Sequence, residues 1–217
     1  MTPGEPLIRW DWLASHIDEI TFRLLEHFEL TTIAIVVGLV IAFALSLVAL
    51  RVPRLYPPIT GVTGVLYTIP SLALFAFLVP YTGFSILTAE IGLVSYTLLI
   101  LIRNIVGGIR GVPTEVRDAA LGMGYTPRQI LWRIELPLAL AVIFAGVRVA
   151  TITTIGLVTV TALIGEGGLG YFILFGIQLF FSTPLLVGAV GSVLFAVVVD
   201  GALVLVQRWL TPWSRVQ

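Results

Sequence analysis

The sequence predicts an all-α integral membrane protein with five transmembrane helices, and three observations support this fold class. The chain has 217 residues, of which 58% are hydrophobic and only 11% are charged. Its mean hydropathy is +1.07. Long segments contain no charged residue, and arginines gather between them. This composition is too apolar for an ordinary water-soluble domain and is typical of proteins that reside in a bilayer.

Five apolar segments are long enough to cross the membrane. An α-helix rises about 1.5 Å per residue, so about twenty apolar residues cross a hydrocarbon core of about 30 Å. No charge lies between Glu29 and Arg51, and Glu90 is the one charged residue in 55–102, which the turn sequence Pro80-Tyr81-Thr82-Gly83 divides. The predicted spans are about 31–50, 59–79, 85–102, 138–164 and 184–206.

The positions of the arginines predict the orientation, because basic residues in short loops stay on the cytoplasmic side. Five crossings place nine arginines on one side, namely Arg51, Arg54, Arg103, Arg110, Arg117, Arg128, Arg133, Arg208 and Arg215. We therefore expect a cytoplasmic loop over 103–137, a cytoplasmic tail over 207–217 and an N-terminus outside. The predicted location is a cell membrane that the chain crosses five times.

The N-terminal segment, 1–30, predicts an amphipathic helix outside the cell. From Trp10 to Leu30, apolar residues recur at helical spacing with acids between them. We expect this helix to lie along the outer interface, with Trp10 and Trp12 near the headgroups. A poorly ordered leader is the alternative. The acidic start differs from a signal peptide, so we expect no cleavage.

The composition excludes several functions. Acidic and basic residues balance at twelve each, so no basic surface indicates a nucleic-acid partner. The chain lacks cysteine, and its two histidines, His16 and His27, make no metal site alone. It also lacks the lysine of a phosphate-binding loop. We expect no cofactor on this chain, and we find no constellation of an intramembrane enzyme.

The loop over 103–137 predicts two short helices. The first has a capping threonine, two acids near its positive end and two terminal glycines, namely Thr114, Glu115, Asp118, Gly122 and Gly124. The second begins with Thr126-Pro127-Arg128-Gln129, which is a capping box with proline at the first helical position. Taken alone, these features also fit a pair of interfacial helices without a docking role.

The same loop resembles the EAA loop of permeases of binding-protein-dependent ABC importers. The string Asp118-Ala119-Ala120-x3-Gly124-x9-Ile134-x-Leu136-Pro137 matches the pattern E-A-A-x3-G-x9-I-x-L-P at every spacing, with Asp for the first Glu. The resemblance implies a type I importer fold, similar to methionine permeases. It also implies that this loop docks on separate ATPase subunits, which bind ATP and Mg²⁺ and hydrolyse the ATP.

Eight residues of this loop are expected to couple the ATPase to the pore, namely Glu115, Asp118, Ala119, Ala120, Gly124, Ile134, Leu136 and Pro137. The two alanines would permit close approach and the glycine a turn. The proline would start the next span stiffly. We expect Asp118 to cap or pair at the joint.

Three further strings resemble permeases for osmoprotectants: Thr68-Ile69-Pro70-Ser71-Leu72-Ala73-Leu74, Ile102-Arg103-Asn104 and Gly165-Glu166-Gly167-Gly168-Leu169-Gly170. The likeness implies import of glycine betaine, carnitine, choline or a similar quaternary amine. It also implies a second permease copy or a homologous permease, and a separate solute-binding protein. Methionine, another amino acid or a sulfonate are alternative solutes. An ion-gradient-driven secondary transporter is the alternative of another class.

Candidate residues of the translocation path or gate are Thr68, Pro70, Ser71, Glu90, Glu166, Gly167 and Gly168. Pro70 should kink the second span, with hydrogen bonds supplied by Thr68 and Ser71. A proline tolerated for packing is the alternative. Glu90 could attract a cation near the outer mouth, although a solvated residue at the start of the third span explains it better. For Glu166, function and loop solvation are not separable.

The fourth span contains small residues at about four-residue spacing, namely Ala141, Ala145, Gly146, Ala150 and Gly156. They predict close helix packing, with a dimer seam at Gly146 and Ala150 as a further hypothesis. Arg148 in the same span is expected to have a structural role toward a partner subunit or the cytoplasmic interface. Asp200 is expected to pair within the bundle.

Overall fold

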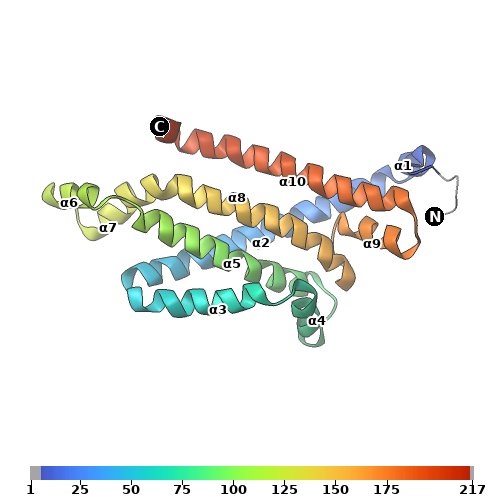
Figure 1. Ribbon diagram of the computed structural model, residues 1–217, viewed down its shortest axis with the longest axis horizontal. Helices are drawn as coiled ribbons and strands as arrows, with labels where there is room; N and C mark the ends of the chain where they lie inside the picture. The colour runs from blue at the N-terminus through green and yellow to red at the C-terminus, as the bar shows by residue number, and fades with distance from the viewer. Residues whose placement is uncertain (1–5, 216–217) are drawn as a thin grey trace.

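The computed structural model describes residues 6–215, and its regular elements in that range are all helical. The longer helices are α2 (Ile17–Arg51), α3 (Tyr56–Thr68), α4 (Ser71–Thr82), α5 (Ile86–Arg110), α8 (Leu136–Val160) and α10 (Ser182–Leu210). The shorter elements are α1 (Trp10–Ser15), η1 (Pro53–Leu55), α6 (Thr114–Gly122), α7 (Pro127–Ile130), η2 (Leu131–Glu135), η3 (Thr161–Ile164), α9 (Gly170–Gln178) and η4 (Pro212–Arg215). Figure 1 shows an elongated bundle in which the long helices run side by side. The all-α prediction is confirmed.

Four continuous helical segments are long and apolar enough to cross a membrane, namely Ile17–Arg51, Ile86–Arg110, Pro127–Ile164 and Ser182–Leu210. A bent pair, Pro53–Thr68 with Ser71–Thr82, gives the fifth candidate. Four of the five predicted spans are therefore confirmed as helices. Each extends beyond its predicted bounds at one end or at both, because a helix can include charged residues that flank the apolar stretch.

The second predicted span does bend at Pro70, but the bend is a break between two helices and not a kink within one helix. The axes of α3 and α4 differ by 96°. Ile69 is extended, with φ −65° and ψ 128°, as a residue before proline tends to be. Thr68 Oγ1 donates to the carbonyl three residues earlier at 2.8 Å, and Tyr96 Oη donates to the Ile69 carbonyl. Ser71, also expected to help, has no side-chain hydrogen bond within 6–215.

The N-terminal amphipathic segment belongs to the first long helix. The 35 residues of α2 span about 52 Å at about 1.5 Å per residue, well beyond a hydrocarbon core of about 30 Å. The sequence predicts an interfacial helix over 10–30 that ends before the first span. This prediction is wrong from Ile17 onward, because α2 passes through Leu30 without a break. The short α1 precedes it, separated by His16.

The core forms around α5, which packs against α2, α3, α4 and α8. A row of small residues lets α2 approach α5 closely, namely Ala34, Gly38, Ala42, Ser46 and Ala49, all buried. On α8, a Cβ added at Gly146 would lie 2.3 Å from Cβ of Asn104 on α5. Gly146 and the fully buried Ala150 therefore pack within the chain. The predicted close packing is confirmed, and the dimer seam at these two residues is wrong.

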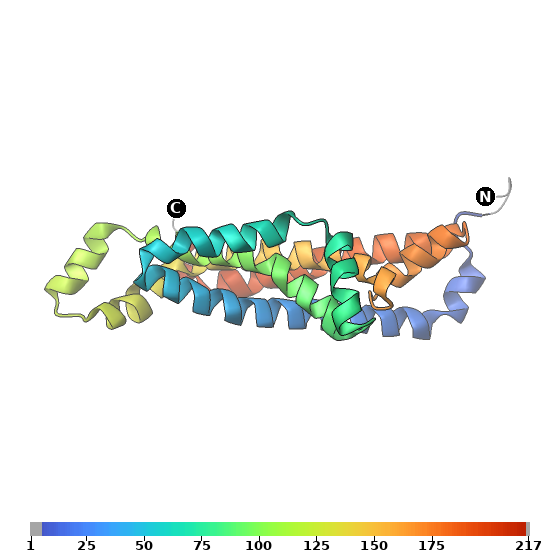
Figure 2. The same ribbon diagram turned by 90° about the horizontal axis from the view of Figure 1, so that it is seen from below.

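The two ends of the bundle differ in composition and in form. Figure 1 shows that α2, α5 and α10 all finish toward the end at which α6 and α7 lie, whereas α1 and α9 lie at the opposite end. Figure 2 shows α6 and α7 reaching beyond the long helices. The arginine-rich segments that the sequence placed on one side of the membrane thus share one end of the molecule.

The other end of the bundle is held together by α2. The backbone N–H of Gly167 donates to Glu26 Oε1 at 3.0 Å, and that of Leu169 donates to His27 Nδ1 at 3.3 Å. The remaining ring nitrogen of His27 lies 3.1 Å from the carbonyl oxygen of Ile155, so the network assigns the proton to Nε2. These contacts attach the glycine-rich turn to the first long helix. The helix α9 that follows was not predicted.

Candidate functional site: the loop between α5 and α8

The first helix of the loop, α6, ends in a well-defined backbone motif. The N–H of Gly124 donates to the carbonyl of Leu121 at 2.9 Å, and the N–H of Tyr125 donates to that of Ala120 at 3.1 Å. This pair of bonds is a Schellman motif, which needs a left-handed residue after the helix. Gly124 supplies it with φ +83°. The predicted glycine turn is confirmed, whereas the predicted capping role of Thr114 is wrong, because Pro113 stands at the cap and Thr114 is inside the helix.

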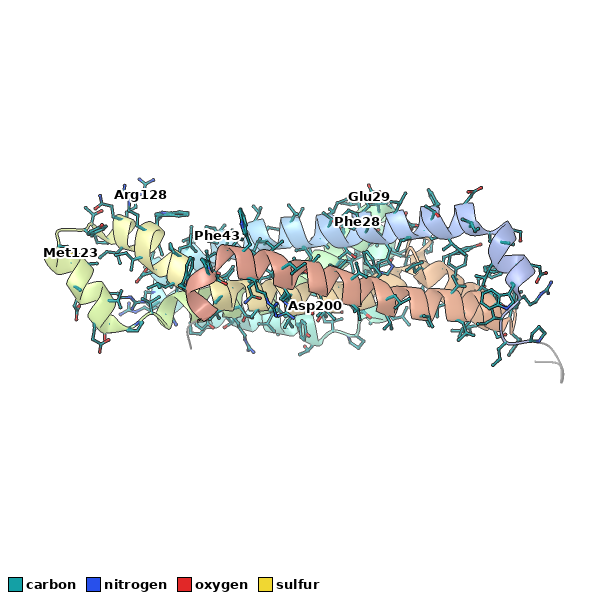
Figure 3. The ribbon with its side chains drawn as sticks, turned by 90° about the horizontal axis from the view of Figure 1, so that it is seen from above. Phe28, Glu29, Phe43, Met123, Arg128 and Asp200 are labelled. Atoms are coloured by element: carbon teal, nitrogen blue, oxygen red, sulfur yellow. The ribbon has the colours of Figure 1, made fainter. Side chains whose placement is uncertain are left out.

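The outer surface of α6 combines acids with apolar side chains. Glu115, Asp118 and Ala119 are exposed, while Ala120 is buried against the rest of the loop. Leu121 and Met123 at the tip are 53% and 69% exposed, and Figure 3 shows Met123 at the extremity of the molecule. Exposed apolar side chains on a protruding helix are typical of a docking surface. Leu121 and Met123 are not among the predicted site residues, although apolar residues in an otherwise polar short loop are a signal that indicates them.

The base of the loop is held by Arg117 and Glu135. Arg117 Nε lies 2.5 Å from Glu135 Oε1, and Arg117 Nη2 donates to the carbonyl of Ile109 at 2.7 Å. One side chain therefore joins the end of α5, the helix α6 and the turn η2. Asp118, which we expected at this joint, is exposed and has no hydrogen bond or ion pair in the described part of the chain. The acid at the joint is Glu135.

The second helix of the loop continues into the next span. The capping box at α7 is confirmed, with Thr126 N–H donating to Gln129 Oε1 at 2.8 Å and Gln129 N–H donating to Thr126 Oγ1 at 3.4 Å. The chain stays helical through η2 and α8, with η2 wound as a π-helix. Pro137 has no N–H, so the carbonyl four residues earlier loses its α-helical partner. In membrane helices, local π-helical winding is one way in which backbone groups freed by a proline find new partners.

Pro137 lies in the first turn of α8, as predicted. The chain is already helical before it, through α7 and η2, so the proline does not mark the change from loop to helix. Of the other two residues in the same part of the motif, Ile134 falls in the π-helical turn and Leu136 in the first turn of α8. Both are half-buried. The EAA residues thus form two groups: one at α6 and its terminal turn, exposed except for the buried Ala120, and a half-buried one where α8 starts.

The remaining candidate residues do not join this site. Glu90 is 9% exposed, and neither carboxylate oxygen has a hydrogen-bond partner among the described residues. The interpretation of Glu90 as a solvated residue is therefore wrong. Glu166 is half-buried in the turn at the opposite end of the bundle. Burial raises the pKa of its carboxyl above the ordinary value, and the neighbouring Glu26 carboxylate adds to the rise.

Gly167 and Gly168 lie in the same turn as Glu166, with φ +135° and +50°. A Cβ at Gly168 would lie 2.5 Å from Cβ of His27, so the turn packs directly on α2.

Arg148 pairs with Asp200 on α10 through two contacts of 2.8 Å. The expected structural role of Arg148 is met within the chain, and Asp200 does pair within the bundle.

Membrane-length helices around a packed core, with a braced helical loop extending from one end, are the architecture of a multi-pass integral membrane protein. Residues 32–212 match the family described as "Binding-protein-dependent transport system inner membrane component". The chain therefore belongs to this family and is the permease component of an ABC importer.

Individual relatives cover almost the whole chain. It is 36% identical to the choline transport system permease protein OpuBB of Bacillus subtilis (strain 168) over 201 residues, which are 93% of each protein. It is 35% identical to the osmoprotectant import permease protein OsmW of Salmonella typhimurium (strain LT2) over 204 residues, 92% of this chain and 94% of the relative.

Solved structures share the fold. A chain of the MetNI methionine ABC transporter in an inward-facing conformation matches with a TM-score of 0.78 and 21% identity, covering 88% of this chain and 96% of that one. A chain of an amino acid ABC transporter with histidines matches with a TM-score of 0.72 and 16% identity, covering 93% and 98%. The expected methionine-permease-like, type I importer fold is confirmed.

Proposed function

We propose that this permease imports a quaternary-amine osmoprotectant (glycine betaine, carnitine or choline), driven by a separate ATPase that docks on α6. The observation that carries the coupling mechanism is the attachment of α6 by Arg117 to α5 and to the start of α8. A helix that both protrudes and is tied to two spans can transmit movement of a partner to the bundle. ATP and Mg²⁺ would be bound by that partner.

The surface of α6 supports a protein partner. Glu115 and Asp118 present negative charge beside the exposed Leu121 and Met123. Such a combination of an apolar centre with a charged rim suits a groove on another protein. The arginine-rich end of the bundle would lie in the cytoplasm, where the ATPase is, and the α1 end outside.

The proposed solute rests on relatives. OpuBB is named for choline and OsmW for osmoprotectants, and both align over more than nine-tenths of this chain. The structural neighbours named for methionine and for an amino acid are at most 21% identical and carry no argument about the solute. A solute-binding protein outside, and a second permease on the uncovered apolar faces of the bundle, would complete the importer.

Uptake measurements test both parts of the proposal. Cells without other importers of these solutes would express the permease together with the candidate ATPase and binding protein. We expect uptake of radiolabelled glycine betaine, carnitine or choline that excess unlabelled methionine does not reduce. Uptake should stop when the ATPase is omitted. Uptake that persists without an ATPase and follows an ion gradient would establish a secondary transporter instead, and uptake of methionine or a sulfonate alone would refute the solute.

A further inference from the structure

A cavity of about 520 Å³ lies between the loop and the adjacent ends of α2 and α5. Its charged lining residues are Arg51, Arg110, Arg117, Arg128 and Glu135, and its apolar lining includes Leu50, Ile109, Leu131 and Trp132. Four cations thus surround one anion, beside a hydrophobic wall. The cavity opens at the arginine-rich end of the bundle.

The positive charge of this cavity is only partly balanced within the protein. Glu135, its one acid, is already paired with Arg117. The guanidinium of Arg110 lies over the ring of Tyr56, 4.8 Å from its centroid. Arg51 and Arg128 are exposed and have no hydrogen-bond or ion-pair partner among residues 6–215. Two guanidinium groups are therefore available to an anion.

The position of the cavity along the helices fits the level of lipid headgroups. It lies where the apolar stretch of α2 ends, at Leu50 and Arg51. Trp132 is 46% exposed and packs on Phe43, with 5.9 Å between ring centroids; Figure 3 shows Phe43 and Arg128 on the same side of the molecule. Tryptophan is enriched at the membrane–water interface. Basic pockets between transmembrane helices on the cytoplasmic side bind anionic lipid headgroups.

We propose that this cavity binds the phosphate of an anionic phospholipid from the adjacent leaflet. Arg51 and Arg128 would contact the phosphate, since a guanidinium matches phosphate oxygens in charge and geometry. Leu50, Leu131 and Trp132 would contact the glycerol and the first acyl carbons. This apolar half of the lining favours a lipid over a free phosphate ion. The site does not depend on which solute is imported.

Lipid retention by the purified full-length chain tests the site. The chain would be delipidated in mild detergent, titrated with phosphatidylglycerol or with phosphatidylcholine, and analysed by native mass spectrometry. The test variant is Arg51→Gln with Arg128→Gln. The matched control is Arg54→Gln with Arg133→Gln, which removes the same charge from exposed arginines of the same region that do not line the cavity.

We expect phosphatidylglycerol to bind the wild type and the control alike, and the test variant about 30-fold more weakly. That factor corresponds to about 2 kcal/mol, at about 1 kcal/mol for each arginine near an anionic membrane. Phosphatidylcholine should bind weakly to all three. Equal thermal unfolding of the two variants would show that both are folded.

Four results would overturn the proposal. Retention by the test variant as strong as in the wild type would mean that these arginines hold no lipid. An equal loss in the control would mean a general charge effect. Displacement of phosphatidylglycerol by inorganic phosphate would identify a free-anion site. Loss of ATPase co-purification in the test variant, with lipid retention intact, would assign the arginines to the protein interface.

Discussion

Arg117 on α6 and Glu135 in the π-helical turn η2 form an ion pair across the base of the loop, with 2.5 Å between Nε and Oε1. Because Arg117 also donates to the Ile109 carbonyl, the pair connects the end of one long helix to the beginning of the next. Both side chains are largely buried, 29% and 14% exposed. We expect movement of α6 to reach α5 and α8 through this contact.

The Arg117→Gln variant should insert into the membrane normally and lose about tenfold or more of its uptake. Coupling energies of contacting pairs are about 0.5–3 kcal/mol, and 1.4 kcal/mol is a factor of ten. The double variant R117E/E135R restores opposite charges and should recover part of the uptake. Equal uptake by R117Q and the wild type would refute the transmitting role.

Gly124→Leu should abolish uptake while leaving membrane insertion intact. The φ of +83° at Gly124 costs other residues about 1–2 kcal/mol, so the turn that positions α6 would change. A Cβ there would meet no atom within 4 Å, which attributes the effect to the backbone and not to crowding. Gly122→Ala, inside α6 and equally uncrowded, is the control and should retain uptake.

Asp200→Ala should destabilise the protein by leaving Arg148 without its partner. The pair is held by two contacts of 2.8 Å between α8 and α10. An uncompensated arginine within a membrane costs about 2.5–3.5 kcal/mol on insertion scales. The midpoint of thermal unfolding in detergent should fall, and Arg148→Met combined with Asp200→Leu should restore most of it. A double variant no more stable than D200A would contradict this account.

Glu166 should make stability depend on pH in a defined direction. Its pKa is raised in the folded protein by burial and by the nearby Glu26, so the folded state binds its proton more tightly than the unfolded state. The destabilising effect of the ionised form is absent below the unfolded pKa, which is about 4.3 for glutamate. It grows as the pH rises and is complete above the folded pKa. Glu166→Gln should remove this dependence, measured by thermal unfolding across pH. An unchanged pH profile would count against it.

Much of the fold could be predicted from the sequence, because transmembrane helices leave long uncharged segments. The EAA loop was located by its spacing, and its glycine turn and capping box depend on local chemistry that the sequence displays. Gly124 and Thr126 are examples, since each acts on residues within a few positions.

The errors have tertiary causes. Proline predicts interruption of a helix but not its angle, so the 96° bend at Pro70 was not foreseen. Asp118 matches the motif, yet the acid that pairs with Arg117 is Glu135. Ion pairs between distant segments depend on how the helices pack, which the motif does not display. Likewise the sequence predicts a structural role for Arg148 and for Asp200 separately, and their pairing depends on α8 and α10 being neighbours. Glu90 lies near the start of a predicted span, where a solvated acid is expected, and its burial arises from other helices that the local sequence does not display.

Labelling of a single cysteine tests most directly whether α6 is a cytoplasmic docking element. The chain has no cysteine, so Met123→Cys provides one reactive group at the exposed tip, and Trp10→Cys, 73% exposed at the opposite end, is the control. A membrane-impermeant maleimide should label M123C in inside-out vesicles but not in intact cells, and a bound ATPase should protect M123C from labelling. W10C should be labelled in intact cells but not in inside-out vesicles, and the ATPase should not protect it. Labelling of M123C from outside intact cells, or equal labelling with and without the ATPase, would contradict the account.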